Sequence, residues 1–175
     1  MEDLRYPIGP FTPSPALSAG EREAAILAIA AVPPALRAAV SGLSEEQLDT
    51  PYRDGGWTIR QVVHHLPDSH LNAYVRFKLA MTEEQPEIRP YDETAWAETE
   101  EARAGELTMS LDLLDHLHRR WVAFMRTLQP DDWSRGLRHP EFDRVLDLDF
   151  MLQLYAWHGA HHVAHIAGLR SRRGW

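Results

Sequence analysis

The sequence predicts an all-α protein, a four-helix bundle that residues 1–175 form as a single domain. Four separate segments carry the hydrophobic spacing or the capping residues of long helices. A polar segment at residues 82–106 is long enough to be a functional crossover or lid, and a plain solvated connector is the alternative. Apolar residues make up 44% of the chain, which is enough for one sizeable core at this length.

The first predicted helix follows an extended N-terminal arm, residues 1–17, which contains four prolines in its first fifteen positions. Ser18 and Glu21 form a capping box, in which each side chain bonds the other residue's backbone N–H, and this marks the start of the helix. Pro33 and Pro34 predict an interruption, with a second helical piece after them.

The second long helix is predicted from Thr58, which forms a capping box with Gln61, to about Met81. A short capped turn, Ser44 with Gln47, precedes it. At 100° per residue one side of this helix is apolar and indicates a core face. That side carries Ile59, Val63, Leu66, Tyr74 and Phe77.

The third helix is predicted at residues 107–128, where large apolar side chains recur every three or four positions. Residues 129–144 then indicate a loop with a short hairpin. The fourth helix is predicted at residues 147–172, which contain no proline. Three arginines near its end, Arg170, Arg172 and Arg173, complement the negative end of a helix.

The composition argues against several classes of function. Acidic residues outnumber basic residues, 26 to 18, and the formal charge of −8 would repel a nucleic-acid backbone. No run approaches the ~20 apolar residues of a membrane span, and the acidic start is not a secretory signal, so we expect a cytoplasmic protein without a membrane partner. The chain has no cysteine, so any metal must be held by His, Asp or Glu.

The stretch WHGAHHVAHI on the last helix places four histidines on the same face as large apolar residues. Burying an imidazole costs roughly 1 to 3 kcal/mol for each polar nitrogen without a partner, so this face needs an explanation. Residues four apart lie above one another on a helix, close enough for two imidazoles to reach one metal ion. Two such pairs exist, His158 with His162 and His161 with His165, and their spacing does not separate them.

A catalytic metal site uses three protein ligands and an open position, so one more ligand is needed. The second long helix offers the stretch HHLPDSH, which contains His64, His65 and His70. His65 shares a polar side of that helix with Asp68 and Asn72, which become candidates for supporting the ligands or contacting substrate. His70 lies on the apolar side, where a hydrogen-bonded core histidine is the expected role.

Three separated motifs resemble the YfiT branch of the DinB-like superfamily of metal-dependent hydrolases. They are PYRDGGWTIRQVVHHLPDSHLNAYVRFKLAMTEE, IRPYDETAW and LYAWHGAHHVAHI, in the family's order and approximate spacing. The resemblance runs from YPIG near the N-terminus to RRGW at the end. It implies a right-handed four-helix bundle of the DinB type, a homodimer, and one divalent metal ion per chain, Zn²⁺ or Ni²⁺, on three histidines.

The resemblance also selects the ligands. The family's first ligand stands eight residues after the tryptophan of its WT-x-R motif, which here is His65. Its other ligands form an HxxxH pair on the last helix, matched by His158 and His162, with His161 and His165 as the competing pair. Pro67 departs from the family, which has a small helix-forming residue there, and an interior proline can kink the helix that carries His65.

Three neutral imidazoles leave a divalent ion its full charge, which can lower the pKa of bound water from ~15.7 to ~7 or deprotonate a bound thiol. Superfamily members similar to this chain include S-transferases for small thiols such as bacillithiol and mycothiol. We therefore expect transfer of a low-molecular-weight thiol to an electrophile. The alternatives are hydrolysis of an amide or ester, and a non-enzymatic metal-binding scaffold in stress responses.

The sequence does not identify a catalytic base. Asp92 and Glu93, in the crossover motif RPYDE, are candidates to reach the site. Arg76 and Arg89 are candidates to hold an anionic group of a small-molecule substrate, although surface or ion-pair roles are expected more often for such arginines.

Overall fold

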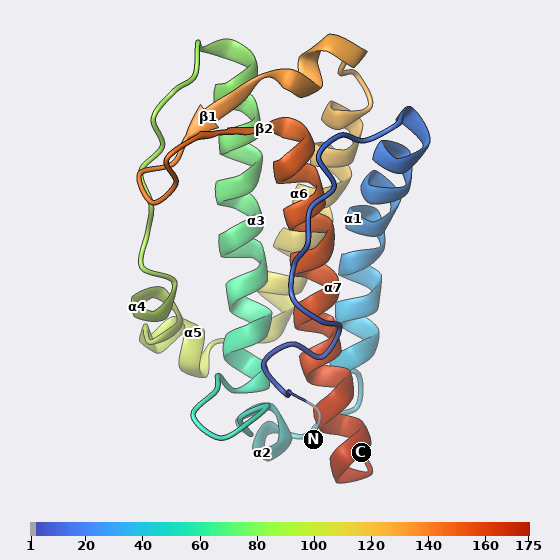
Figure 1. The fold of residues 1–175 in the computed structure, drawn as a ribbon. Helices are drawn as coiled ribbons and strands as arrows, with labels where there is room; N and C mark the ends of the chain where they lie inside the picture. Colours follow the sequence, from blue (N-terminus) through green and yellow to red (C-terminus); the bar gives the residue numbers. More distant parts are fainter. Residues whose placement is uncertain (1–2) are drawn as a thin grey trace.

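A computed structural model of the chain describes residues 3–175 and contains four long helices side by side (Figure 1). These are α1 (Ala19–Val40), α3 (Ile59–Thr82), α6 (Leu107–Met125) and α7 (Leu148–Arg173). The predicted four-helix bundle is confirmed. The third helix ends three residues earlier than its hydrophobic pattern suggested, in a turn formed by the backbone N–H groups of residues 126–128.

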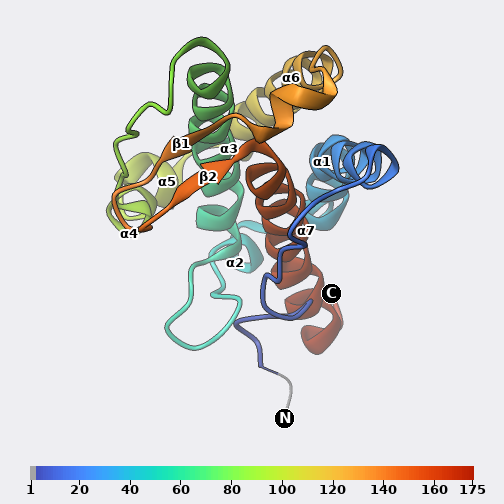
Figure 2. The same cartoon turned by 45° about the horizontal axis from the view of Figure 1, so that its top comes forward.

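The shorter elements lie in the connections. They are α2 (Glu45–Leu48), α4 (Glu93–Ala97), α5 (Glu100–Ala104), the 3₁₀-helix η1 (Pro130–Ser134), β1 (Gly136–Arg138) and β2 (Val145–Asp147). The two strands pair antiparallel with Leu137 opposite Leu146, so the predicted hairpin is present. Figure 2 shows the hairpin crossing one end of the bundle, where β1 contacts α3 and β2 contacts α7.

The connection between α3 and α6 returns along the length of the bundle, as Figure 1 shows. As a result α3 and α6 run in the same direction, and α1 and α7 run in the opposite one. Each of α1 and α3 packs against both α6 and α7. The crossover is confirmed, and it is not plain loop, because α4 and α5 lie within it and contact α3 near its first turns.

Local side chains begin the helices where the sequence predicts. Capping boxes are present at Ser18 with Glu21, at Ser44 with Gln47, and at Thr58 with Gln61. Each box satisfies backbone N–H groups that have no partner within the helix. The start of α7 is capped by Asp147 alone, whose side chain accepts from the backbone N–H of Phe150.

The predicted interruption at Pro33 and Pro34 is wrong, because α1 continues through both residues. A proline lacks the N–H that would bond the carbonyl four residues earlier, so Pro33 leaves the Ile29 carbonyl without its usual partner. His118 on α6 supplies a replacement: its Nδ1 lies 2.7 Å from the Ile29 oxygen. The helix α3 likewise continues through Pro67.

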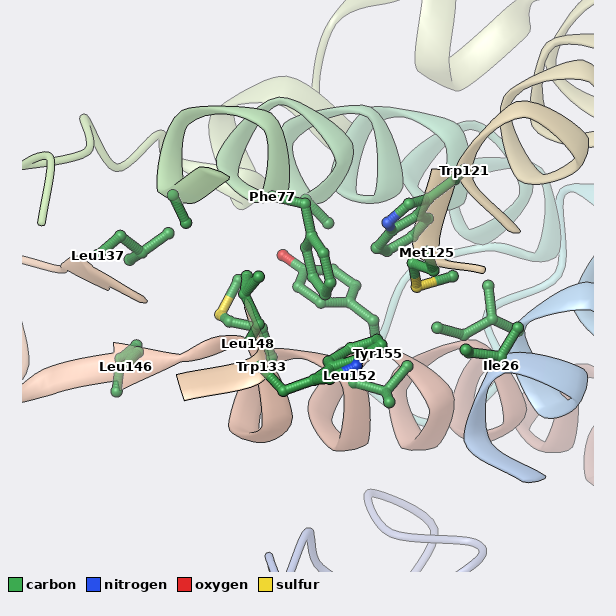
Figure 3. Close-up of a cluster of buried hydrophobic side chains, with 14 of the residues drawn as sticks. Ile26, Phe77, Trp121, Met125, Trp133, Leu137, Leu146, Leu148, Leu152 and Tyr155 are labelled. Carbon is green, nitrogen blue, oxygen red and sulfur yellow. The ribbon is translucent and has the colours of Figure 1, made fainter. Parts of the chain in front are cut away.

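The core consists of two apolar clusters, one toward each end of the bundle. One contains Phe77, Trp121 and Tyr155 and is drawn in Figure 3, and the other contains Leu36, Leu66 and Leu114. Every long helix contributes to both clusters. Between the two clusters, His70 lies on α3 between Leu66 and Ala73, and His118 lies on α6 between Leu114 and Trp121. His158 and His162 lie at the corresponding level of α7, so a polar layer divides the apolar core.

The helix α1 is long and apolar enough to cross a membrane by length and composition alone. In this fold it is a helix of the bundle, with Ile29 and Leu36 fully buried. It approaches α7 closely at Gly159, where a Cβ atom would lie 2.4 Å from Cγ2 of Val32. The absence of a side chain at Gly159 therefore lets the two helices meet at the level of the histidines.

Candidate metal centre

Three histidines converge between α3 and α7. His65, His158 and His162 each offer one ring nitrogen, and these nitrogens all lie within 4.8 Å of one another. Nε2 of His65 is 3.3 Å from Nε2 of His158. His158 and His162 stand one turn apart on α7, and His65 faces them from α3, so the three residues expected as ligands are brought together.

Burial keeps the three imidazoles neutral. Desolvation lowers the pKa of His65 to about 4. It also lowers the pKa of His158 and of His162 well below the usual value, and the neighbouring histidines add to both shifts. Neutral imidazoles keep a lone pair available at neutral pH, and three nitrogen donors on one side of a cavity are a donor set typical of zinc, nickel and related ions. The residues therefore fit the implied divalent metal.

Trp57 covers part of this triad. Its ring centroid lies 4.7 Å from that of His65, and it stacks nearly parallel to His162 at 6.3 Å. The tryptophan comes from the loop just before α3, so the motif that begins the helix also covers the ligand eight residues later.

The competing pair, His161 and His165, lies beside the triad and lines the same cavity, but its rings stack on other groups. His161 stacks on Trp157 at 4.3 Å, and His165 stacks on Tyr52 at 4.0 Å. Nε2 of His165 lies 3.3 Å from the carbonyl oxygen of Arg5 in the N-terminal arm. A carbonyl only accepts, so this nitrogen carries a proton and has no lone pair for a metal.

Behind the triad lie two fully buried histidines. His70 contacts His158, with 3.1 Å between Nε2 of His70 and Nδ1 of His158, and its role as a hydrogen-bonded core histidine is confirmed. Nδ1 of His70 is 2.8 Å from Nε2 of His118. Sequence reasoning missed His118, although its spacing from Leu114 and Trp121 places it on the apolar face of α6.

The triad opens into a cavity of about 480 Å³. The crossover supplies Glu93 and Thr94 to its wall, and α3 supplies Ser69. Of the other sequence candidates, neither Asp68 nor Asn72 lines this cavity, and Asn72 donates to the backbone carbonyl of Asp68. Burial and the charge of Glu101 raise the pKa of Asp68 to about 6.

The remaining polar candidates of the crossover and α3 also lie outside that wall. Asp92 caps α4, where its carboxylate accepts from the N–H of Ala95 at 2.8 Å. Arg76 and Arg89 do not line the cavity. These two arginines therefore do not reach the cavity at the triad, where an anionic group of a substrate would lie.

A second cavity of about 800 Å³ adjoins the first and shares Tyr52, Arg53 and Gly55 with it. Four arginines line the second cavity, from the N-terminal arm, the loop before α3 and the end of α7: Arg5, Arg53, Arg172 and Arg173. Asp3 and Asp54 are also in its wall, and Asp3 pairs with Arg5. Sequence reasoning did not group these arginines because they are far apart along the chain.

The fold and the three-histidine site define a class of protein. The model of the DinB superfamily matches residues 28–166, and the chain belongs to this superfamily. The protein named "Putative metal-dependent hydrolase YfiT" of Bacillus subtilis is 49% identical over 173 residues, which cover 99% of this chain and 97% of that protein. A relative of Bacillus mycoides with the same functional name is 49% identical over the whole of both chains.

The solved structure of YfiT from Bacillus subtilis matches this one with a TM-score of 0.96 over 98% of each chain. It is described as "a probable metal-dependent hydrolase with an unusual four-helix bundle topology". The expected family and fold are thus confirmed, and the homology supports a metal-dependent enzyme. The names of these relatives do not extend to thiol transfer or to the identity of the metal.

Proposed function

We propose that this protein is a metal-dependent enzyme that transfers a low-molecular-weight thiol to an electrophile. One divalent ion per chain, Zn²⁺ or Ni²⁺, would be held by His65, His158 and His162. Within residues 3–175 the cluster of possible donors has these three members and no fourth. A structural zinc site is usually closed by four ligands, so a three-donor site beside a cavity favours an enzyme over a non-enzymatic scaffold.

The observation that carries the proposal is the pair of adjoining cavities. A transferase must hold two substrates next to each other, whereas a hydrolase needs one substrate and water. The cavity at the triad has room for an electrophile and the reacting sulfur, and the larger cavity has room for the rest of the thiol. Arg5 is paired with Asp3, and the other three arginines, Arg53, Arg172 and Arg173, favour a thiol with carboxylate groups, which guanidinium groups bind well.

The residues around the triad have separate roles in this proposal. A divalent ion bound there would supply a Lewis acid that lowers the pKa of a thiol at neutral pH. Trp57 shields His65 and His162 from bulk water, and Arg53, which lines both cavities, orients the anionic end of the thiol toward the triad. Because the chain has no cysteine, the transferred sulfur comes from a cosubstrate.

An S-conjugation assay tests the proposal. Protein loaded with Zn²⁺ or Ni²⁺ and its metal-stripped form would be compared on a panel of small thiols with a fluorogenic electrophile. We expect metal-dependent conjugation that is faster with carboxylate-bearing thiols than with 2-mercaptoethanol. Equal rates for the loaded and stripped forms with every thiol would contradict the proposal.

The arginine cavity has its own test. Arg53→Ala should raise the KM for a carboxylate-bearing thiol about tenfold and leave the KM for 2-mercaptoethanol within about twofold, as expected for one charge-assisted contact. Arg126→Ala is the matched control, because Arg126 pairs with Glu23 at the surface and lines neither of these cavities. An equal effect of Arg53→Ala on both thiols would remove the cavity from the proposal.

Hydrolysis of an amide or ester is the second candidate. The functional names of the relatives favour it, and so does Glu93, the carboxylate in the wall of the cavity at the triad. Metal-dependent turnover of ester or amide panels, with no conjugation of any thiol, would favour this reaction. We also propose a homodimer in the cytoplasm, and sedimentation of the purified protein tests its oligomeric state.

A further inference from the structure

We infer that a line of hydrogen bonds from the Ile29 carbonyl through His118 and His70 determines which ring nitrogen of His158 is free to bind the metal. His118 and His70 are positioning residues in this inference, because neither belongs to the triad. The inference rests on the metal-binding part of the proposed function and is independent of the reaction that the metal supports.

The line begins at a proline. Pro33 has no N–H, so the carbonyl of Ile29 lacks its usual partner within α1. Nδ1 of His118 lies 2.7 Å from that oxygen. A carbonyl oxygen can only accept a hydrogen bond, so the proton must be on Nδ1 of His118. The backbone of α1 thus fixes the tautomer of a histidine on α6.

The next two bonds follow from the first. A neutral imidazole carries one proton, so Nε2 of His118 is an acceptor and the nitrogen 2.8 Å away, Nδ1 of His70, must donate. Nε2 of His70 is then an acceptor in turn. Nδ1 of His158 lies 3.1 Å from it and must donate. The remaining nitrogen of His158, Nε2, therefore carries a lone pair.

This direction holds only while the interior histidines are neutral. A doubly protonated His118 would donate at both nitrogens, reverse the next two bonds and place a proton on Nε2 of His158. The surroundings oppose such a charge: His118 is 1% exposed and His70 is 0% exposed. Trp121 and Tyr155 pack edge-on against the ring of His70, at centroid distances of 5.9 and 5.3 Å.

The unprotonated nitrogen of His158 faces the other two histidines of the triad. Nε2 of His158 lies 3.3 Å from Nε2 of His65, inside the group of donors that could hold an ion. A hydrogen bond to the far nitrogen of a ligand histidine fixes its tautomer and ring orientation, and loss of such a partner typically costs ~10 to 100-fold in metal affinity. The three bonds thus make His158 ready for a metal before one binds.

The first test needs no metal. Two-bond ¹H–¹⁵N correlation spectra of the metal-free, wild-type protein at neutral pH report which ring nitrogen of each histidine is protonated. We expect His118, His70 and His158 all to carry the proton on Nδ1. A proton on Nε2 of His158 in that state would overturn the inference, whatever the protein catalyses.

The second test measures Zn²⁺ affinity by competition with a chelator. His70→Leu removes the acceptor for His158 and should weaken binding about 10 to 100-fold. His70→Gln places an amide oxygen where Nε2 was, so it should restore most of the affinity. Rescue by glutamine separates a hydrogen-bonding role from simple filling of space.

His64→Leu is the matched control. His64 is equally buried on α3, but it bonds Ser110 and the Gly105 carbonyl on the side away from the triad. It should lower the free energy of unfolding and leave Zn²⁺ affinity within about threefold. Equal losses of affinity in His70→Leu and His70→Gln, or in His70→Leu and His64→Leu, would contradict the inference. If the wild-type protein bound no Zn²⁺ or Ni²⁺ at all, the proposed metal site would fail, and the spectra would still decide the tautomers.

Discussion

Two histidine pairs with the same spacing lie on the same helix and do different things. His158 and His162 face His65 across the bundle, and their nitrogens meet within one small volume. His161 and His165 line the same cavity but lie outside that volume, and their rings contact the N-terminal arm, Trp157 and Tyr52. The comparison shows that an HxxxH spacing makes a metal pair possible, and that the groups opposite the pair decide whether it is one.

The hydrogen bonds of the two pairs explain the difference further. Nδ1 of His158 donates into the interior, toward His70, which leaves Nε2 free for a ligand role. Nε2 of His165 donates to the backbone of Arg5, so its proton occupies the nitrogen at the end of the ring. His158 thus has a free nitrogen for a metal, whereas His165 binds the backbone of the N-terminal arm.

The largest expected effect comes from removing a histidine of the triad, with removal of His161 from the other pair as the comparison. His162→Ala should abolish stoichiometric binding of Zn²⁺ or Ni²⁺, a loss of more than about 100-fold in affinity, because two imidazoles do not make a stable site. His65→Ala should do the same. His161→Ala should retain one ion per chain. Metal content by mass spectrometry after dialysis measures all three.

Helix content by circular dichroism is the control for these variants, and it should stay largely unchanged. Loss of the ion in His161→Ala with retention in His162→Ala would exchange the roles of the two pairs. Retention in His65→Ala would remove the α3 histidine from the ligand set.

The stability of the metal-free protein should depend steeply on pH. Burial lowers the pKa of His65, His161 and His165 to about 4 in the fold, against about 6.5 in the unfolded chain. The unfolded state therefore binds more protons between these values. The free energy of unfolding that these histidines contribute should be fully present above pH 6.5. It should fall by several kcal/mol as pH drops toward 4, because each histidine contributes about 1.4 kcal/mol per unit of pKa shift.

Denaturant unfolding across this pH range measures the effect. In the metal-free protein, His165→Gln should reduce the change of unfolding free energy with pH. It should leave the stabilisation by saturating Zn²⁺ unchanged, because His165 is outside the triad. A slope of zero between pH 6.5 and 4 would contradict the burial of these histidines as neutral groups.

Gly159→Ala tests the packing that places both pairs. The added Cβ would lie 2.4 Å from Cγ2 of Val32 on α1, so the helices must separate locally. We expect the free energy of unfolding to fall by about 1 to 3 kcal/mol, the usual cost of overpacking a core. Thermal unfolding measures it, with Gly20→Ala as the control, since nothing lies within 4 Å of a Cβ at that position.

The smallest effect is expected from Tyr6→Ala in the N-terminal arm. Tyr6 contacts His161, which is outside the triad, with 6.1 Å between ring centroids. Metal affinity should change less than about threefold, and amide hydrogen exchange of the arm near Arg5 should increase. A larger loss of affinity would mean that the arm and the pair His161 and His165 support the metal site.

Much of the fold could be predicted from the sequence because its signals are local. The capping boxes at Ser18, Ser44 and Thr58 join residues three positions apart, so no tertiary contact is needed to recognise them. The apolar faces of the helices and the length of the crossover can likewise be recognised from the sequence. The pattern also predicted a buried histidine face, while the choice of His65, His158 and His162 as ligands came from a resemblance to a known family.

Only the tertiary structure decided what depends on partners far apart in sequence. The helical periodicity of α7 places both histidine pairs on one face. The positions of α3 and of the N-terminal arm then give the two pairs different partners. The prolines of α1 predicted a break because their effect was judged within the helix alone. The bond from His118 to Ile29, 89 residues away, replaces the lost N–H, and such a contact exists only once the helices have packed.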